Sequence, residues 1–311
     1  MTAIIGGLGA AFMWAGATLA SSRSSRMIGS RVVLAWVMIV GTVIGLPIAL
    51  ATGVPTDVGP DAPILLLIAG LCYAGGLGVA YSALTVGKVG IVAPIVATEG
   101  AIAALIAVAL GDELGAGAAL ILAVIVAGVV LSSIEPARPA VPAADFEIEA
   151  DALDGPPSAE SELMRAISTA GADNTPKAVA LAITAAVIFG VGLVATGKAA
   201  VDVPPIWVAV SVRVIGLVVV VLPLLLQRRL VLTRAALPLV LISGTGEIIG
   251  STLSAWGASI NIAITAVLGS QFAAIAAVLA FILFRERISR TQVLGVVLIG
   301  VGVTALAGTS G

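Results

Sequence analysis

Three ionisable side chains stand inside long apolar stretches of this sequence. Glu99 lies in IVAPIVATEGAIAALI (91–106), Arg213 in WVAVSVRVIGLV and Glu247 in SGTGEIIGSTLS. A charge at the centre of a bilayer costs about 2.5–3.5 kcal/mol on insertion scales, so such a residue usually faces a cavity or a partner. Glu99 could therefore carry a proton or bind a cation, with Thr98 beside it widening the cavity.

Each of the three residues also has a structural interpretation. Glu99 could be an acid that pairs with Arg213, or a side chain that snorkels to the interface. Arg213 keeps its proton and needs an acid or carbonyls close by, so it either stabilises the fold or binds a substrate carboxylate or phosphate. Glu247 stands among small residues that permit close helix packing, and it pairs with Arg213 or lines a cavity.

A proline and several aromatic residues complete the candidate site. Pro94 cannot donate to the carbonyl of Gly90 and should kink its helix, which predicts a hinge. Four aromatic residues, Trp14, Tyr73, Tyr81 and Trp256, are candidate walls of a binding site, although packing or an interfacial belt of aromatic residues would explain each of them as well.

The residue types that are missing limit the chemistry. The sequence has no histidine and one cysteine, Cys72, so the usual proton shuttle is absent and no intramolecular disulfide can form. No metal-ligand cluster, nucleophile–base pair or phosphate-binding loop of the G-x-x-x-x-G-K-[ST] type is visible. We therefore expect neither an enzyme nor a bound metal or cofactor, and no nucleic-acid partner. Energy should come from a transmembrane ion gradient, with the proton as the first candidate.

Composition assigns the chain to the membrane. Of its 311 residues, 60% are hydrophobic and only 10% are charged, and mean hydropathy is +1.20; soluble domains carry about 25% charged residues. The hydropathy predicts an all-α polytopic membrane protein with ten transmembrane helices. The first span has no preceding basic region, which predicts a retained helix rather than a cleaved signal peptide. The expected spans are roughly 2–20, 31–51, 63–86, 88–110, 115–134, 178–197, 206–226, 236–259, 262–284 and 291–308.

An acidic, proline-rich segment divides the ten spans into two groups of five. Residues 135–176 hold nine acids and two arginines, a net charge of −7, and cannot bury a core. We expect a first five-helix repeat over 1–134, a linker over 135–176 and a second five-helix repeat over 177–311.

Basic residues in the short loops predict the orientation in the membrane. The short odd-numbered loops, without the linker, hold ten lysines and arginines, whereas the even-numbered loops hold only Lys198. The positive-inside rule then places the odd-numbered loops in the cytoplasm and both termini outside. The ten residues are Arg23, Arg26, Arg31, Lys88, Arg228, Arg229, Arg234, Arg285, Arg287 and Arg290.

The two halves resemble each other in sequence. The first span aligns with the sixth, pairing Trp14 with Phe189, and the end of the third aligns with the eighth, pairing Tyr81 with Trp256. Glu99 lies 14 residues before Glu113, and Gln271 lies 15 before Glu286, so Glu99 and Gln271 are nearly equivalent. Because each unit has an odd number of spans, the second copy must be inverted, and inverted repeats place a substrate site at their interface.

The equivalent positions also differ in one respect. Where the fourth span has Pro94, the ninth has Leu268 and Gly269. This difference makes Gly269 the second candidate hinge.

These motifs, in order and duplicated, resemble the drug/metabolite transporter superfamily. They are the aromatic-plus-glycine first span, the end of the third span, the Ala-Pro turn that opens the fourth, and the Glu-then-Gly start of the fifth. The closest resemblance is to the EamA-like transporters with ten helices. Two features depart from it: the loop GDELGAG lacks the family's arginine, and relatives are usually drawn with cytoplasmic termini.

The resemblance implies a secondary active transporter, often an exporter, that works by alternating access in the cell (inner) membrane. Zwitterionic amino acids or amines fit a site holding Glu99, Gln271, Glu247 and Arg213, so we expect a small polar or amphipathic metabolite as substrate. A flippase of a lipid-linked precursor is the alternative. Besides the substrate and the lipid bilayer, the only partner expected is a second copy in a weak homodimer; otherwise the protein is a monomer.

Overall fold

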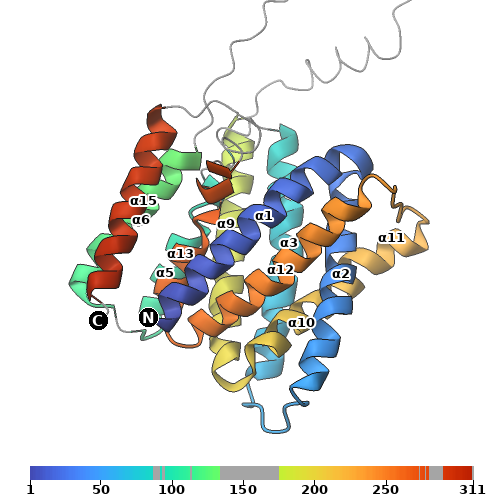
Figure 1. Cartoon of the computed structure of the whole chain (residues 1–311), viewed down its shortest axis with the longest axis horizontal. Coiled ribbons are helices and arrows are strands. Elements are labelled where there is room, and N and C mark those ends of the chain that lie inside the picture. The colour runs from blue at the N-terminus through green and yellow to red at the C-terminus, as the bar shows by residue number, and fades with distance from the viewer. Residues whose placement is uncertain are drawn as a thin grey trace, which may run out of the picture.

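The computed structural model is a bundle of apolar helices (Figure 1). It describes residues 1–86, 92, 95–112, 114–133, 175–272, 274–276, 278–279 and 290–309, and every structural statement below refers to these residues. No strand occurs in this part of the chain, which confirms the predicted all-α class. The predicted linker lies outside the described residues except for its last two positions, because α9 begins at Thr175.

In the part of the chain that the structure describes, ten helical spans follow one another in the predicted order. Six of them are long and apolar enough to cross a membrane as single stretches. In the first half the helices are α1 (Thr2–Ile28), α2 (Ser30–Ala51), α3 (Ala62–Val86), α5 (Glu99–Ala109) and α6 (Ala116–Ser133). In the second half they are α9 (Thr175–Asp202), α10 (Pro205–Gly216), η1 (Leu217–Val221), α11 (Leu222–Leu226), α12 (Leu237–Ala258), α13 (Ile262–Gly269) and α15 (Arg290–Thr309).

The first helix is longer than its apolar sequence predicts. We expected it to end near residue 20 and to leave Arg23 and Arg26 in a loop, but α1 continues to Ile28. Serine and arginine permit a helix once the chain has left the hydrocarbon, so hydropathy marks the membrane boundary rather than the helix end. Gly29 ends the helix, because its φ of 86° lies in the left-handed region that suits glycine.

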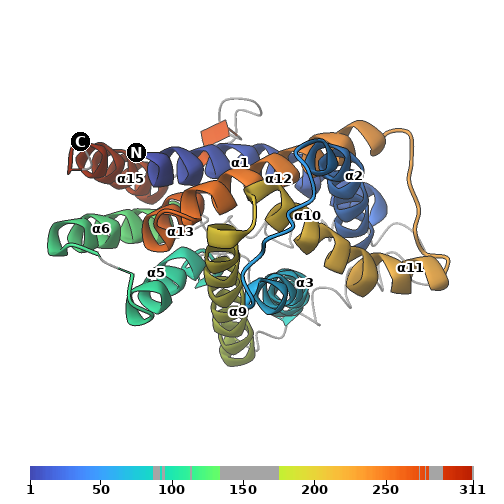
Figure 2. The same cartoon turned by 90° about the horizontal axis from the view of Figure 1, so that it is seen from below.

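The helices pair in a pattern that relates the two halves. α1 packs against α12, and its counterpart pair in the other half, α9 and α3, also packs together (Figures 1 and 2). The pairs α2–α10, α5–α13 and α6–α15 each join a span to its own counterpart. Exchanging the halves therefore maps these pairs onto themselves, as a twofold relationship between repeats predicts. The contact of α10 with α12 has no counterpart of similar extent between α2 and α3 among the described residues.

Glycines bring the central helices unusually close together. A Cβ placed on Gly6 of α1 would lie 2.6 Å from the Cα of Gly257 on α12. Without side chains at this contact, the two backbones meet directly, in the small-residue manner of membrane helices. This close contact fixes α1 and α12 as the frame on which the polar residues of α12 are held.

The seventh span changes its winding after Arg213. Over Leu217–Val221 it forms a π-helical turn, in which the N–H of Leu222 donates to the carbonyl of Leu217. Pro223 follows at once; it has no N–H to donate and its ring crowds the preceding turn, which favours such a bulge. The counterpart proline, Pro47, is accommodated in an uninterrupted α2, so the two halves differ mechanically here.

Candidate functional site

An ion pair between α10 and α12 lies at the centre of the candidate site. Arg213 is completely buried, and its Nη2 lies 3.1 Å from Oε2 of Glu247. The same nitrogen donates to the carbonyl of Glu247 at 3.0 Å and to Oγ of Ser251 at 2.6 Å. The sequence allowed either Glu99 or Glu247 to pair with Arg213. In the structure the partner is Glu247.

Two further helices enclose this ion pair. Tyr73 of α3 donates its hydroxyl to Oε2 of Glu247 at 3.2 Å, and the guanidinium of Arg213 lies 5.0 Å from the centre of the Tyr73 ring. On α2, a Cβ at Gly41 would lie 3.2 Å from Cδ of Arg213. The missing side chain at Gly41 provides room for the arginine. Sequence reasoning did not single out Gly41, because a glycine in an apolar span is unremarkable until its neighbour is known.

The fourth and ninth spans are both interrupted at the positions that the repeat makes equivalent. The fourth span turns at Ala97 and Thr98 before α5 begins at Glu99. The ninth turns at Ser270 and Gln271 after α13 ends at Gly269. Thr98 Oγ1 donates to the carbonyl of Ile95 at 2.6 Å, and Ser270 Oγ to that of Val267 at 2.9 Å. Each hydroxyl thus supplies a hydrogen bond at the end of an interrupted helix.

The two interruptions are in contact. A Cβ on Gly100 would lie 2.5 Å from the carbonyl oxygen of Ala266 and 2.7 Å from Oγ of Ser270. Glu99 and Gln271, the residues next to this contact, come from opposite halves of the chain. Interrupted helices that meet at a repeat interface are a common way to build a transporter's substrate site.

Glu99 is a second carboxylate in this region. It is partly exposed, and it is close enough to Glu247 for the two carboxylates to interact electrostatically. No hydrogen bond or ion pair links it to Arg213 in the described part of the chain. The site therefore combines one arginine, already paired with Glu247, and one additional acid.

The other predicted site residues lie in different surroundings. Trp14 of α1 packs edge-on against Phe272, with ring centroids 6.4 Å apart, next to the ninth-span interruption. Trp256 is 41% exposed on α12. Tyr81 belongs to α3, but its side chain lies outside the described residues, as does the whole of Pro94.

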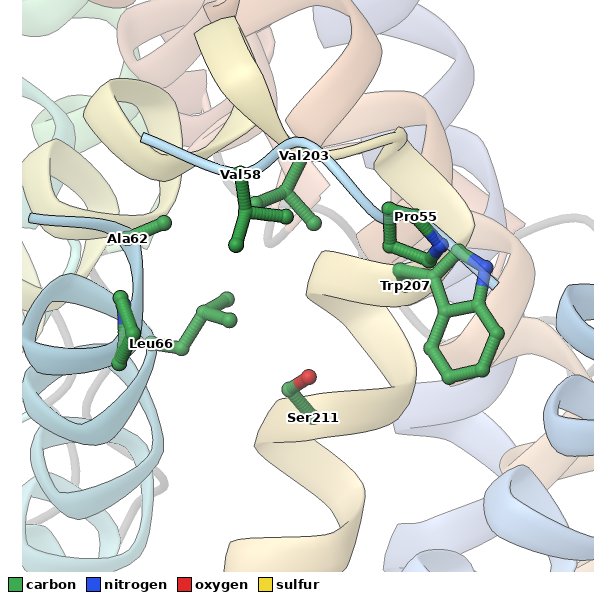
Figure 3. A pocket seen from close by; sticks show the side chains of 8 residues that line it. Pro55, Val58, Ala62, Leu66, Val203, Trp207 and Ser211 are labelled. Atoms are coloured by element: carbon green, nitrogen blue, oxygen red, sulfur yellow. The ribbon is translucent and has the colours of Figure 1, made fainter. Parts of the chain in front are cut away.

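A small apolar pocket lies at the end of the bundle where α9 passes into α10 (Figure 3). Its volume is about 100 Å³. Trp207, on its wall, donates from Nε1 to the carbonyl of Gly53 at 2.9 Å and so holds the α2–α3 loop against α10. The pocket offers one hydroxyl, that of Ser211, and no charged group, so it lacks the groups that would recognise a polar solute. The lining residues are Pro55, Val58, Ala62, Pro63, Leu66, Val203, Trp207 and Ser211.

Among the described residues, no three histidine, cysteine, aspartate or glutamate side chains gather as a metal site would require. What the site offers is a fixed arginine–glutamate pair, a separate acid and buried amide and indole groups. These groups can recognise a small solute that carries both polar and charged atoms.

Comparison with known proteins gives a family and a fold. The model of the EamA-like transporter family matches residues 1–134 and 176–308. One protein of known crystal structure superposes with a TM-score of 0.71 at 18% identity, over 97% of this chain and 95% of that one. At this identity the likeness concerns the fold alone. No curated protein sequence matches the chain.

Proposed function

The chain belongs to the EamA-like transporter family, and from this premise we propose that it is a secondary active exporter of a small polar or amphipathic metabolite, such as an amino acid or an amine. Its place is the inner membrane of the cell, and its cycle is alternating access between the two repeats. The resemblance found in the sequence is confirmed by the family match, and that match makes the protein a membrane transporter. The substrate class, direction and mechanism are our proposal.

One observation carries the proposal. The fourth and ninth spans are interrupted at equivalent positions, and the interruptions meet, so that Glu99 and Gln271 lie at the junction of the two halves. A substrate bound at this junction touches both halves at once. Relative movement of the halves would then change which side of the membrane the substrate can reach.

Glu99 is the proposed coupling group. Arg213 is already neutralised by Glu247, so Glu99 is the acid whose charge is available to a proton or to the cationic group of a substrate. Protonation would discharge Glu99 and release a bound cation, which ties substrate movement to the proton gradient. Gly269, at the end of α13, and Pro94 are the proposed hinges on either side of the junction.

Transport by purified protein in proteoliposomes tests this function. We expect a pH gradient to drive uptake of an amino acid or amine into the proteoliposomes. We expect Glu99→Gln to abolish this dependence on the pH gradient. Asp61→Asn, which makes the same chemical change in the exposed loop before α3, should transport like the wild type. Everted vesicles should accumulate the substrate, since an exporter pumps inward in that orientation.

Two results would contradict the proposal at different levels. If Glu99→Gln keeps a gradient-driven rate equal to that of the wild type, Glu99 is not the coupling group. If no amino acid or amine is moved by the wild type while another solute is, the substrate class is wrong and the transporter assignment stands.

A further inference from the structure

Four exposed arginines surround one contact between α2 and the loop that precedes α12. Trp36, in the second turn of α2, donates from Nε1 to the carbonyl of Val231 at 3.0 Å, so the start of α2 and this loop form one surface. In the part of the chain that the structure describes, no ion pair includes any of the four. We call them the arginine surface: Arg31 at the start of α2, and Arg228, Arg229 and Arg234 in the loop.

The helix ends beside two of these arginines do not balance their charge. Arg31 lies in the first turn of α2, and Arg234 lies just before the first turn of α12. The N-terminus of a helix carries partial positive charge, which disfavours a cation and attracts an anion. Neither helix has an acid in its first turn. The negative charge that suits these two ends must come from another segment.

The backbone at Arg228 also favours a role for its side chain. α11 ends in a turn in which the N–H of Arg229 donates to the carbonyl of Leu224 at 2.9 Å. Arg228 has a φ of 53°, the left-handed conformation in which glycine is the usual residue at a helix end. The nearby C-terminus of α11 favours a cation, but it leaves the Arg228 side chain exposed to other partners.

The acids of the described residues lie away from the arginine surface. They belong either to the loops and helix ends at the opposite end of the bundle or to the interior of the spans: Asp57, Asp61, Asp112 and Asp202 in the first group, Glu99 and Glu247 in the second. Outside the linker, the sequence predicts one further acid at the arginine end, Glu286, and it stands between Arg285 and Arg287. The linker is therefore the segment of this chain that can supply the missing charge.

The linker starts and ends at the same end of the bundle as the arginine surface. It joins the end of α6 to the start of α9, both at the end away from the two termini (Figure 1). Its net charge of −7 over 135–176 compares with +5 for the rest of the chain, −2 minus −7. Within it, DFEIEADALD (145–154) holds five acids and no basic residue.

The length of the linker lets these acids reach the arginines. Asp145 follows Ser133 by twelve residues, and Asp154 precedes Thr175 by 21. An extended chain covers about 3.3 Å per residue, so the two arms span up to about 40 Å and about 70 Å. Neighbouring helix axes are about 10 Å apart, and the arms can therefore cross several helices.

Several charges acting together make such a contact stable. A single exposed ion pair contributes little and is screened by salt. Five acids within ten residues can meet four arginines at once, and the tether raises their effective concentration to about the millimolar range. Anionic lipid headgroups are the other source of negative charge at this end, but binding them would leave the linker charge of −7 beside a surface of the same sign.

We propose that residues 145–154 of the linker dock on the arginine surface of the same chain. The docked segment contacts α2, from the first half, and the loop before α12, from the second. The contact is electrostatic and therefore weakens as the salt concentration rises. It does not depend on which solute the protein transports.

Cross-linking in the full-length protein tests the docking. On a Cys72→Ala background, Ala150→Cys in the linker is combined either with Ala235→Cys, next to Arg234, or with Thr291→Cys, next to Arg290; positions 235 and 291 are both exposed. Because α15 packs along α6, from which the linker starts, a linker that does not dock would meet position 291 at least as often as position 235.

We expect the docked linker to favour position 235 strongly. In phosphatidylcholine nanodiscs at low salt, a short bismaleimide should join 150 to 235 at least tenfold faster than 150 to 291, with the yields measured by mass spectrometry of the digested monomer. Raising the salt to about 0.5 M should remove the difference, because the screening length then falls below 5 Å.

Variants on both sides of the contact assign it to charge. Replacing Arg228, Arg229 and Arg234 together by Gln should slow the 150–235 cross-link at least fivefold, whereas Arg290→Gln, the matched control at the same end of the bundle, should leave it unchanged. Replacing the five acids of 145–154 by their amides should give the same loss without altering any helix, which separates docking from a folding defect of the arginine variant.

Three outcomes would overturn the proposal. Equal rates for positions 235 and 291 at low salt would show that the linker does not dock. A preference for 235 that disappears in phosphatidylglycerol nanodiscs would assign the arginines to anionic lipid. Cross-links between two chains instead of within one would assign them to the linker of a second copy. None of these results bears on the transported solute, so the proposed function is tested separately.

Discussion

Arg213 and Glu247 are joined through a single guanidinium nitrogen, Nη2, which lies 3.1 Å from Oε2 of the acid. The contact links α10 to α12, and the hydroxyl of Tyr73 on α3 binds the same carboxylate oxygen. One carboxylate therefore holds three helices of the bundle together. Glu247 is therefore engaged in structural contacts, whereas Glu99 has no ion pair with Arg213 among the described residues.

Removing Glu247 should destabilise the protein strongly. Glu247→Ala leaves the Arg213 charge buried without its counter-charge, which we expect to cost about 3–5 kcal/mol. The double variant Arg213→Met, Glu247→Ala removes both charges and should recover most of this loss. Melting temperatures in one detergent would measure both; a double variant less stable than Glu247→Ala would contradict the pairing.

The contact between the two interrupted spans should not tolerate a side chain at Gly100. Its Cβ would lie 2.5 Å from a backbone oxygen of α13, so Gly100→Ala must push α5 away from α13. Overpacking of this kind costs about 1–3 kcal/mol. We therefore expect both the melting temperature and the transport rate of Gly100→Ala to fall.

Gly75→Ala provides the matched control, since a Cβ at Gly75 of α3 meets no atom of the described residues within 4 Å. It should behave like the wild type in both the melting and the transport measurements. Wild-type transport by Gly100→Ala would contradict a functional role for the junction.

The ion pair between Asp112 and Lys198 is expected to break during the transport cycle. Lys198 Nζ lies 3.2 Å from Asp112 Oδ1 and joins the end of α9 to the segment between α5 and α6. Both side chains are partly exposed, so the pair itself should be worth less than about 1 kcal/mol, and Asp112→Asn should barely change the melting temperature.

Cross-linking the same positions should instead stop transport. After Cys72→Ala removes the one native thiol, cysteines at 112 and 198 joined by a short bifunctional reagent would hold the halves together at this end. We expect transport to be lost on cross-linking and restored when a cleavable reagent is cut. Unimpaired transport by fully cross-linked protein would show that this end does not open.

Both termini are predicted to lie outside the cytoplasm. The start of α1 and the end of α15 lie at the same end of the bundle (Figure 1), so one fusion site reports on both. Arg31, at the start of α2, and Arg228, between α11 and α12, are both exposed. Alkaline phosphatase fused after residue 311 should be active and a fluorescent protein dark; the reverse result would invert the orientation.

Much of the fold could be predicted because membrane insertion is governed by local composition. The ten spans and their order follow from apolar length and from the internal repeat, and the structure confirms them. The resemblance of the motifs to the EamA-like transporters is confirmed by the family match. The predicted end of the first helix, near residue 20, was too early, because hydropathy cannot locate a helix end that lies in water. Hydropathy also gave no sign of the π-helical turn at Leu217–Val221, which depends on hydrogen bonding within one helix turn.

The candidate site, like the fold, could be predicted from the sequence only in part. The sequence alone predicted that Glu99, Arg213 and Glu247 stand inside apolar spans and that Glu99 matches Gln271, because span and repeat register are properties of position along the chain. Only the tertiary structure decided that Arg213 pairs with Glu247, that Tyr73 and Gly41 enclose the pair, and that Trp14 lies between Gly250 of α12 and Gly269 of α13. Which residues meet depends on how each helix is rotated about its axis, and that rotation is set by the packing of all its neighbours together.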